Sequence, residues 1–291
     1  MKKLIKIAIT ISLLLFPTSI TAGITLKDHA GRDVFLENIP SRIVSLAPSI
    51  TEIIFAIGQG RRLVGITRYC NYPPETLSIP KVGGMIDPDY ERILLLKPDI
   101  VIISKDGSTR DTLSRIESLG IKTFVLGPRS IPEILDSIRI MGKITGNEQS
   151  AESIVNGIMK RMDAIKKKQK GLRKKRILFL IWERPMIAVG AGTFINEMIE
   201  LAGGINVIRD KAVKYPRLSK EDVLRLNPEV IVLCGDFNAD ALSSGNGGLS
   251  KMIDAIRNRR VFRVEVDYYE RPGPRFIEGV EELFQLLHGE R

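Results

Sequence analysis

The sequence contains the same short pattern twice, and this duplication limits the folds that the chain can adopt. Residues 89–101 read DYERILLLKPDIV and residues 219–231 read SKEDVLRLNPEVI, so that Pro98 and Pro228 are 130 positions apart. In each copy an amphipathic stretch ends at the proline, and an acid and an apolar run follow. Proline stops a helix and forces the preceding residue toward an extended conformation, so each copy predicts a helix followed by a strand. The duplication predicts two similar lobes.

Short apolar runs alternate with helical patterns along the chain. Strands are expected at 42–46, 63–66, 100–103 and 122–126, with helices between them at about 49–58, 89–97, 108–119 and 131–144. The run RIVSL at 42–46 has a counterpart, RILFL, at 176–180, which extends the duplication. Strands separated by helices form parallel sheets covered on both faces, so the predicted fold class is α/β with two similar lobes and mainly parallel sheets. A hairpin is expected around residues 24–36, and Ser49 to Glu52 has the pattern of a helix capping box.

The segment between the two halves predicts one long helix. Apolar residues recur at helical spacing at positions 154, 158, 162 and 165, and few helix breakers occur before Gly171. The chain is therefore divided into an N-terminal lobe at 23–146, a connecting helix within 147–175 and a C-terminal lobe at 176–291. A single rigid connection predicts only modest opening and closing of the cleft between the lobes.

Residues 1–22 have the features of a secretory signal peptide. Three lysines precede an apolar run from Ile7 to Phe16, and small residues before Gly23 provide a cleavage site. No cysteine lies near that site to carry a lipid anchor. The mature chain is expected to be periplasmic. Its two cysteines, Cys70 and Cys234, fall in different predicted lobes, so two separate thiols are expected although an oxidising compartment permits disulfides.

The basic net charge does not indicate nucleic-acid binding. Loss of the leader removes three lysines and no acids, so the formal net charge falls from +10 to +7. Much of the remaining excess lies between Lys160 and Arg176, with no aromatic residue among the charges. Such a block is typical of a solvated helix face.

Candidate ligand contacts follow the predicted strands. Ligands of doubly wound sheets bind beyond the carboxyl ends of the strands, and the single tryptophan and all tyrosines lie in predicted loops or at helix starts: Tyr69, Tyr72, Tyr90, Trp182, Tyr215, Tyr268 and Tyr269. Because both residue types prefer one wet end, part of this placement is generic. The proline-rich segment Asp267 to Arg275 is expected to present Asp267 and Arg271 to a cleft; the alternative is that these two form only a mutual salt bridge.

Glu91 and Glu221 occupy matching first-turn positions of the two duplicated helices. The helix dipole favours an acid there, which accounts for each residue singly. Together, one acid on each lobe would form a two-point charged footprint that steers a basic partner.

These features resemble the periplasmic cobalamin-binding proteins of bacterial ABC importers, whose lobes are bridged by one long helix. The likeness extends from Ile43 to Leu287 and is most specific in four pieces: residues 69–74, the two glutamate-bearing helices, residues 215–217 and residues 267–275. It implies that the protein is a monomer that carries a corrinoid as transported ligand, without a cofactor of its own. It implies a corrinoid cleft lined by Tyr69, Met85, Tyr215, Asp267 and Arg271, and docking of Glu91 and Glu221 onto arginines of an inner-membrane permease.

Other functions are compatible with parts of the sequence. Receptors for ferric siderophores or haem share the fold, and Tyr69 or Tyr215 could bind haem iron. A zinc or manganese receptor needs several histidines, but only His29 and His288 occur, one near each terminus. An enzyme is disfavoured because the GAG at 190–192 lacks the rest of a dinucleotide fingerprint and no GxSxG element is present.

Overall fold

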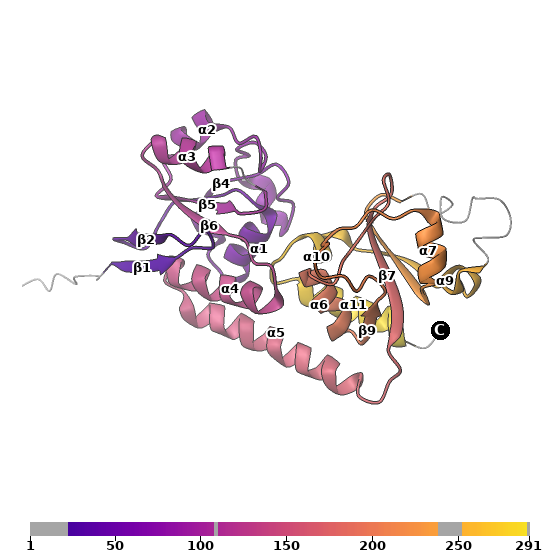
Figure 1. The fold of residues 1–291 in the computed structure, drawn as a ribbon. Coiled ribbons are helices and arrows are strands. Elements are labelled where there is room, and N and C mark those ends of the chain that lie inside the picture. The colour runs from indigo at the N-terminus through magenta and orange to yellow at the C-terminus, as the bar shows by residue number, and fades with distance from the viewer. Residues whose placement is uncertain (1–22, 108–109, 238–251, 290–291) are drawn as a thin grey trace, which may run out of the picture.

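The computed structural model describes residues 23–107, 110–237 and 252–289. The predicted signal peptide lies outside these residues. Figure 1 shows two α/β lobes side by side, with one long helix running along both. Within the described ranges, no helix has the length and apolar content needed to cross a membrane.

The N-terminal lobe is built on a four-stranded parallel sheet. Its order is β4 (Leu63–Ile66), β3 (Ile43–Ser45), β5 (Ile100–Ser104) and β6 (Lys122–Leu126). The helices of the lobe are α1 (Pro48–Ala56), α2 (Tyr90–Leu95), α3 (Arg110–Ser118) and α4 (Ile131–Thr145), with 3₁₀ turns at Gly60–Arg62 and Pro74–Ser78. The hairpin of β1 (Ile24–Lys27) and β2 (Asp33–Leu36) precedes it.

The C-terminal lobe repeats this topology. Parallel strands follow the order β9 (Gly204–Asn206), β7 (Lys175–Trp182), β10 (Val230–Cys234) and β11 (Val261–Val264), which matches β4-β3-β5-β6 position by position. The short β8 (Ile187–Ala188) adds an antiparallel pairing to β7. The helices are α6 (Phe194–Leu201), α7 (Lys220–Leu226), α9 (Asp254–Arg257), α10 (Val266–Glu270) and α11 (Phe276–His288). The predicted duplication is therefore confirmed as a repeat of the fold.

The two helix–proline–strand junctions are alike in atomic detail. Lys97 and Asn227, each directly before its proline, both have positive φ angles, of 44° and 38°. Asp99 accepts a hydrogen bond from the backbone N–H of Arg42 at 2.8 Å, and Glu229 accepts the equivalent bond from Arg176 at 2.9 Å. The acid after each proline thus ties the incoming strand to its neighbour at the amino end of the sheet.

The connecting helix α5 spans Glu148–Lys168, about 32 Å at 1.5 Å per residue. Its buried side chains, Ala151, Val155, Ile158 and Ile165, belong to one apolar cluster that continues into α4 of the first lobe and into α6 and α11 of the second. Arg161 adds ion pairs to Glu278 and Glu281 of α11, at 2.9 and 2.7 Å. A shared core of this kind opposes large independent movement of the lobes.

The start of the first helix differs from the prediction. Helix α1 begins at Pro48, its N-cap is Ala47, and no side chain caps it. The capping box expected from Ser49 and Glu52 is therefore wrong, because Pro48 sets the first helical turn one residue earlier. Glu52 instead lies inside the helix, 3% exposed. The expectation of two separate thiols is confirmed: Cys70 and Cys234 are free and buried, each in its own lobe.

Candidate functional site

The carboxyl end of the second sheet carries a hollow. It is lined by the end of β7, by residues after β7 and β10, and by α10, among them Trp182, Arg184, Asp236, Val266 and Glu270. Trp182, the single tryptophan of the chain, is 60% exposed. A hollow beside an exposed aromatic side chain is a candidate ligand site.

Tyr215 lies where the two lobes approach each other. It sits on a segment that runs alongside β8, because Ala188 donates its backbone N–H to Pro216 O at 3.0 Å. Burial, with smaller contributions from Asp106 of the first lobe and Glu270 of the second, raises the pKa of Tyr215 above its ordinary value. The influence of acids from both lobes on one phenol indicates that the carboxyl edges of the two sheets face each other here.

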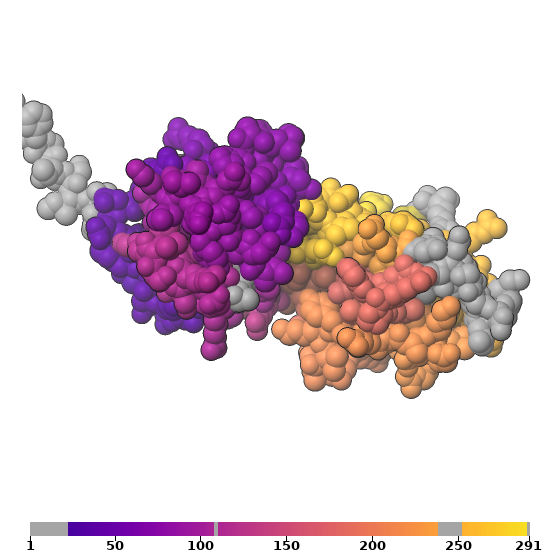
Figure 2. All heavy atoms as spheres, turned by 90° about the horizontal axis from the view of Figure 1, so that it is seen from above, coloured from indigo at the N-terminus to yellow at the C-terminus, as the bar shows by residue number. Residues whose placement is uncertain are grey.

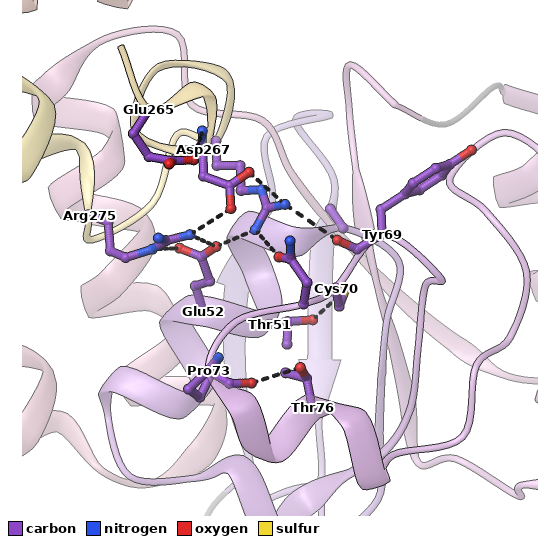
Figure 3. Close-up of polar contacts among 12 residues, drawn as sticks. Thr51, Glu52, Tyr69, Cys70, Pro73, Thr76, Glu265, Asp267 and Arg275 are labelled. Carbon is purple, nitrogen blue, oxygen red and sulfur yellow. Dashed lines mark hydrogen bonds and ion pairs between the residues drawn. The ribbon is translucent and has the colours of Figure 1, made fainter. Parts of the chain in front are cut away.

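Tyr69 and Met85 belong to the carboxyl edge of the first sheet. Tyr69 follows β4 and is 47% exposed, with the guanidinium of Arg68 over its ring at 5.2 Å. Its ring points away from the charged cluster described below (Figure 3). Met85 is half-buried and packs on Gly107, where an added Cβ would lie 2.9 Å from the Met85 sulfur. The Tyr69 loop reaches the second lobe, since Tyr69 O accepts a hydrogen bond from Arg271 at 3.4 Å, and the Met85 loop is joined to it by the bond from Arg68 N–H to Gly83 O at 2.9 Å.

Asp267 and Arg271 lie next to each other, as part of a contact between the two lobes (Figure 3). Arg271 forms ion pairs with Asp267 at 2.8 Å and with Glu52 of α1 at 2.9 Å. Arg275 binds both oxygens of Glu52, at 2.8 and 2.6 Å, and also reaches Asp267 at 3.3 Å. Two cations and two anions therefore form a compact, nearly neutral group, which is called the interlobe ion cluster below.

The interlobe ion cluster is shielded from water. The side chains of Arg271 and Arg275 are 14% and 16% exposed, and that of Glu52 is 2% exposed. Burial opposes the charge of Arg275, but its hydrogen bonds to Glu52 and Asp267 outweigh this, so its pKa lies above the ordinary value. Removing one partner from such a group leaves an uncompensated charge, at a typical cost of about 3–5 kcal/mol.

Several tyrosines that follow strands support this contact instead of facing an open cleft. The Arg275 guanidinium lies 3.9 Å from the ring centre of Tyr72 and 5.4 Å from that of Tyr268. Tyr269 is fully buried and donates its hydroxyl hydrogen bond to Gly279 O and Glu282. Tyr268 and Tyr269 are thus explained by packing. Tyr72 is 44% exposed but is engaged by Arg275, which leaves Tyr69 and Tyr215, each 47% exposed, as the exposed tyrosines whose rings lie outside this cluster.

Figure 2 shows the arrangement from the outside. The C-terminal segment, in yellow, contacts the first lobe, and a notch separates that lobe from the orange part of the second.

The hollow carries an excess of acids. Glu183, Asp236 and Glu270 line it together with one base, Arg184. Burial, and secondarily the neighbouring Asp267, raises the pKa of Glu270, while Arg271 partly opposes this. The surface therefore favours hydrogen-bond donors and cations over anions.

Glu91 and Glu221 are not among the residues that line the hollow. Both are exposed in the first turns of α2 and α7, which Figure 1 places on the side of the molecule away from α5. Asp89 and Ser219 cap the two helices. Among the described residues, neither glutamate side chain has an ion-pair partner. Both carboxylates are thus accessible to another molecule.

The GAG segment at 190–192 has a packing function. A Cβ on Gly190 would lie 2.1 Å from Val213 O, and one on Gly192 would lie 2.7 Å from Lys211 O. Gly190 also donates its N–H to Lys214 O at 2.7 Å. The glycines allow the segment that carries Tyr215 to approach β8 closely. Helix α6 then begins with Thr193 as its N-cap.

We expect Gly190→Ala to displace the Tyr215 segment, because a methyl group cannot fit between two backbones at this distance. Stability should fall by about 1–3 kcal/mol, measured by urea unfolding. Gly157→Ala is the matched control, since nothing lies within 4 Å of a Cβ at this position of α5. The control should be neutral or stabilising by up to about 1 kcal/mol. Equal stability of the two variants would refute the close-packing account.

Sequence reasoning missed Glu52 and Arg275. A single acid within the apolar run Ile50–Phe55 was a usable signal, because a charge on a buried helix face requires a partner. That partner lies more than 200 positions away, so the local pattern could not identify it. No group of three metal-ligating side chains occurs in the described part of the chain.

Comparison with known proteins identifies the family. Residues 43–268 match the model of the periplasmic binding protein family. An uncharacterized ABC transporter substrate-binding lipoprotein of Bacillus subtilis is 32% identical over 272 residues, which cover 91% of this chain and 85% of the relative.

Solved structures agree with this family match. The periplasmic vitamin B12-binding protein of Vibrio cholerae has a TM-score of 0.74 and 28% identity, covering 85% of this chain and 96% of that one. The periplasmic haem-binding protein RhuT of Roseiflexus sp. RS-1 has a TM-score of 0.72 and 28% identity, covering 84% and 97%. The predicted two-lobed fold and the resemblance to cobalamin-binding proteins are confirmed. Because the family model spans most of the chain and the relative matches over most of its length, the protein belongs to the periplasmic binding protein family, as a substrate-binding component of an ABC transporter.

Proposed function

We propose that the protein captures a corrinoid between its lobes and delivers it to an ABC permease. The observation that carries the proposal is the exposed aromatic and apolar surface at the facing carboxyl edges of the two sheets. Trp182 and Tyr215 provide it from the second lobe, and Tyr69 and Met85 from the first. A large planar ring buried between such surfaces gains roughly 25 cal/mol per Å² before the costs of ordering. No catalytic step is required.

The polar groups of the gap also suit a corrinoid. A corrin ring carries amide side chains, whose N–H groups donate hydrogen bonds. Asp236 and Glu270 in the hollow are acceptors for such donors. Asp267 and Arg271 would border the ligand where the lobes touch, with their charged groups already paired with each other and that of Arg271 also with Glu52. Amide groups held in this way fix the orientation of the ring, and the apolar faces supply affinity.

Haem or a ferric siderophore is the second candidate, favoured by the accessible phenols of Tyr69 and Tyr215 and by the similarity to a haem-binding protein. Ligation of ferric iron by tyrosine uses the phenolate. The acids of the hollow repel haem carboxylates and anionic chelates. This feature supports the neutral, amide-rich ligand over the anionic ones.

A fluorescence titration can test the ligand, because Trp182 is the only tryptophan and lies in the hollow. Cyanocobalamin, haemin and a ferric hydroxamate siderophore would each be titrated into the purified protein, with correction for their absorbance. We expect saturable quenching with sub-micromolar affinity only for cyanocobalamin. Absence of cyanocobalamin binding at micromolar concentration, with tight binding of haemin or the siderophore, would reject the corrinoid in favour of the second candidate.

The partner is inferred from the rims of the lobes. We propose that Glu91 and Glu221 dock onto basic sockets of the permease, one from each lobe, and that the leader at 1–22 directs the monomeric protein to the periplasm. The exposure of both carboxylates at matching positions of α2 and α7 supports a two-point footprint. One acid on each lobe, each facing a basic socket, would steer the encounter and set its register.

A further inference from the structure

We propose that Glu52 is a positioning residue that sets the separation of the lobes for ligand capture, by holding Arg271 and Arg275 of the opposite lobe. The proposal rests on the ligand-binding function inferred above. Glu52 belongs to α1, whereas Arg271 and Arg275 flank the turn between α10 and α11. Every hydrogen bond between them therefore joins the two lobes.

The geometry of Glu52 leaves little freedom. Its two oxygens accept three N–H groups, from Arg271 Nη1 at 2.9 Å and from Arg275 Nε and Nη2 at 2.8 and 2.6 Å. The planar fork of Arg275 meets both carboxylate oxygens, which fixes orientation as well as distance. Because the Glu52 side chain is 2% exposed, water cannot replace these partners without separating the lobes.

Arg271 carries the contact to the loop that bears Tyr69. Its Nη1 also donates to Asn71 Oδ1 at 2.7 Å, and its Nη2 donates to Tyr69 O at 3.4 Å. Both terminal nitrogens are thus occupied by groups of the first lobe or by Asp267. One guanidinium of the second lobe holds α1 and the Tyr69 loop together, so a change at Glu52 would act on the cleft through Arg271.

A second point of attachment limits rotation. Helix α5 joins the lobes along one side, and the Glu52 contacts join them at α1 and α10, away from that helix (Figure 1). Lobes joined only along α5 could rotate about that helix, whereas a second attachment at Glu52 resists this rotation. Tyr72 and Tyr268 stack on Arg275 and restrict it further. The interlobe ion cluster therefore holds Trp182 and Tyr215 opposite the first lobe.

The test compares Glu52→Gln with Glu152→Gln, an exposed glutamate of α5 that pairs with Arg139 of the neighbouring α4 at 2.9 Å. Spin labels on Leu77→Cys and Lys220→Cys, both at exposed positions, report the distance between the lobes. The native thiols do not interfere, because both are buried and burial raises the pKa of Cys234 to about 12. Electron–electron double resonance gives the distance distribution without ligand, and a titration gives the affinity for cyanocobalamin.

We expect Glu52→Gln to shift or broaden the distance distribution and to weaken cyanocobalamin binding about 10-fold, whereas Glu152→Gln changes neither. Arg275→Lys keeps the charge but loses the fork, so it serves as a second variant if Glu52→Gln does not fold. An unchanged distribution in the folded variants would overturn the proposal, even if affinity falls. A wider distribution with unchanged affinity would also overturn it. If the wild type does not bind cyanocobalamin, the corrinoid assignment fails, while the distance comparison still decides whether Glu52 holds the lobes.

Discussion

Reversing both rim charges, with Glu91→Lys and Glu221→Lys, is expected to abolish delivery of the ligand to the permease while ligand binding stays unchanged. Each carboxylate is exposed in the first turn of a short capped helix. A lysine there would face a basic socket, and like charges at an interface cost several kcal/mol each, which weakens docking by about 100-fold or more. Binding to the permease in nanodiscs and uptake into proteoliposomes would measure the effect.

The control for this experiment is Glu75→Lys with Glu148→Lys, which changes the net charge equally at exposed positions outside α2 and α7. Single reversals should give intermediate docking affinities, because each lobe supplies one contact. Equal docking by the double reversal and by the control would contradict the footprint. A loss of cyanocobalamin binding in the double reversal would instead indicate damage to the lobes.

Truncation of the tryptophan, Trp182→Ala, is expected to cause the largest loss of ligand affinity from any single side chain. Central aromatic contacts contribute about 2–4 kcal/mol on truncation, which corresponds to about 30- to 1,000-fold weaker binding. Because Trp182 is 60% exposed, the free energy of unfolding should change by less than about 0.5 kcal/mol. Since this variant lacks the fluorescent reporter, calorimetry or equilibrium dialysis would provide the affinity.

Trp182→Phe should retain most of the affinity, since it keeps an aromatic face and loses only the indole N–H, which donates to Arg184 O at 3.1 Å. Leu77→Ala is the control outside the cleft, because Leu77 is an exposed apolar residue of a surface turn. Unchanged cyanocobalamin affinity in Trp182→Ala would exclude the hollow as the binding site.

Local signals in the sequence predicted most of the fold. Strands β4 and β6 have the predicted bounds. The helix–proline–strand repeat predicted two lobes, and the two junctions also share a positive φ at the residue before each proline. These features depend on residues near one another in the chain, where periodicity and proline chemistry act directly. The predicted start of α1 was wrong because the sequence offers both a capping pattern and a proline that can begin the same helical turn.

The site was predictable only in part. Residue chemistry indicated which loops border the gap, and Asp267 and Arg271 were singled out together. Their principal partner, Glu52, was not found, because a side chain more than 200 positions away supplies it. Stacking of Tyr72 and Tyr268 on Arg275 was missed for the same reason. Pairing across lobes depends on how the lobes are placed, which no local pattern contains.

A crystal structure of the protein with cyanocobalamin tests the central claim most directly. The account predicts the corrin ring in the gap between the lobes, with Tyr69 and Met85 toward one face and Trp182 and Tyr215 toward the other, and the interlobe ion cluster intact at its edge. A corrinoid bound on an outer surface, or in contact with only one lobe, would contradict capture between the lobes.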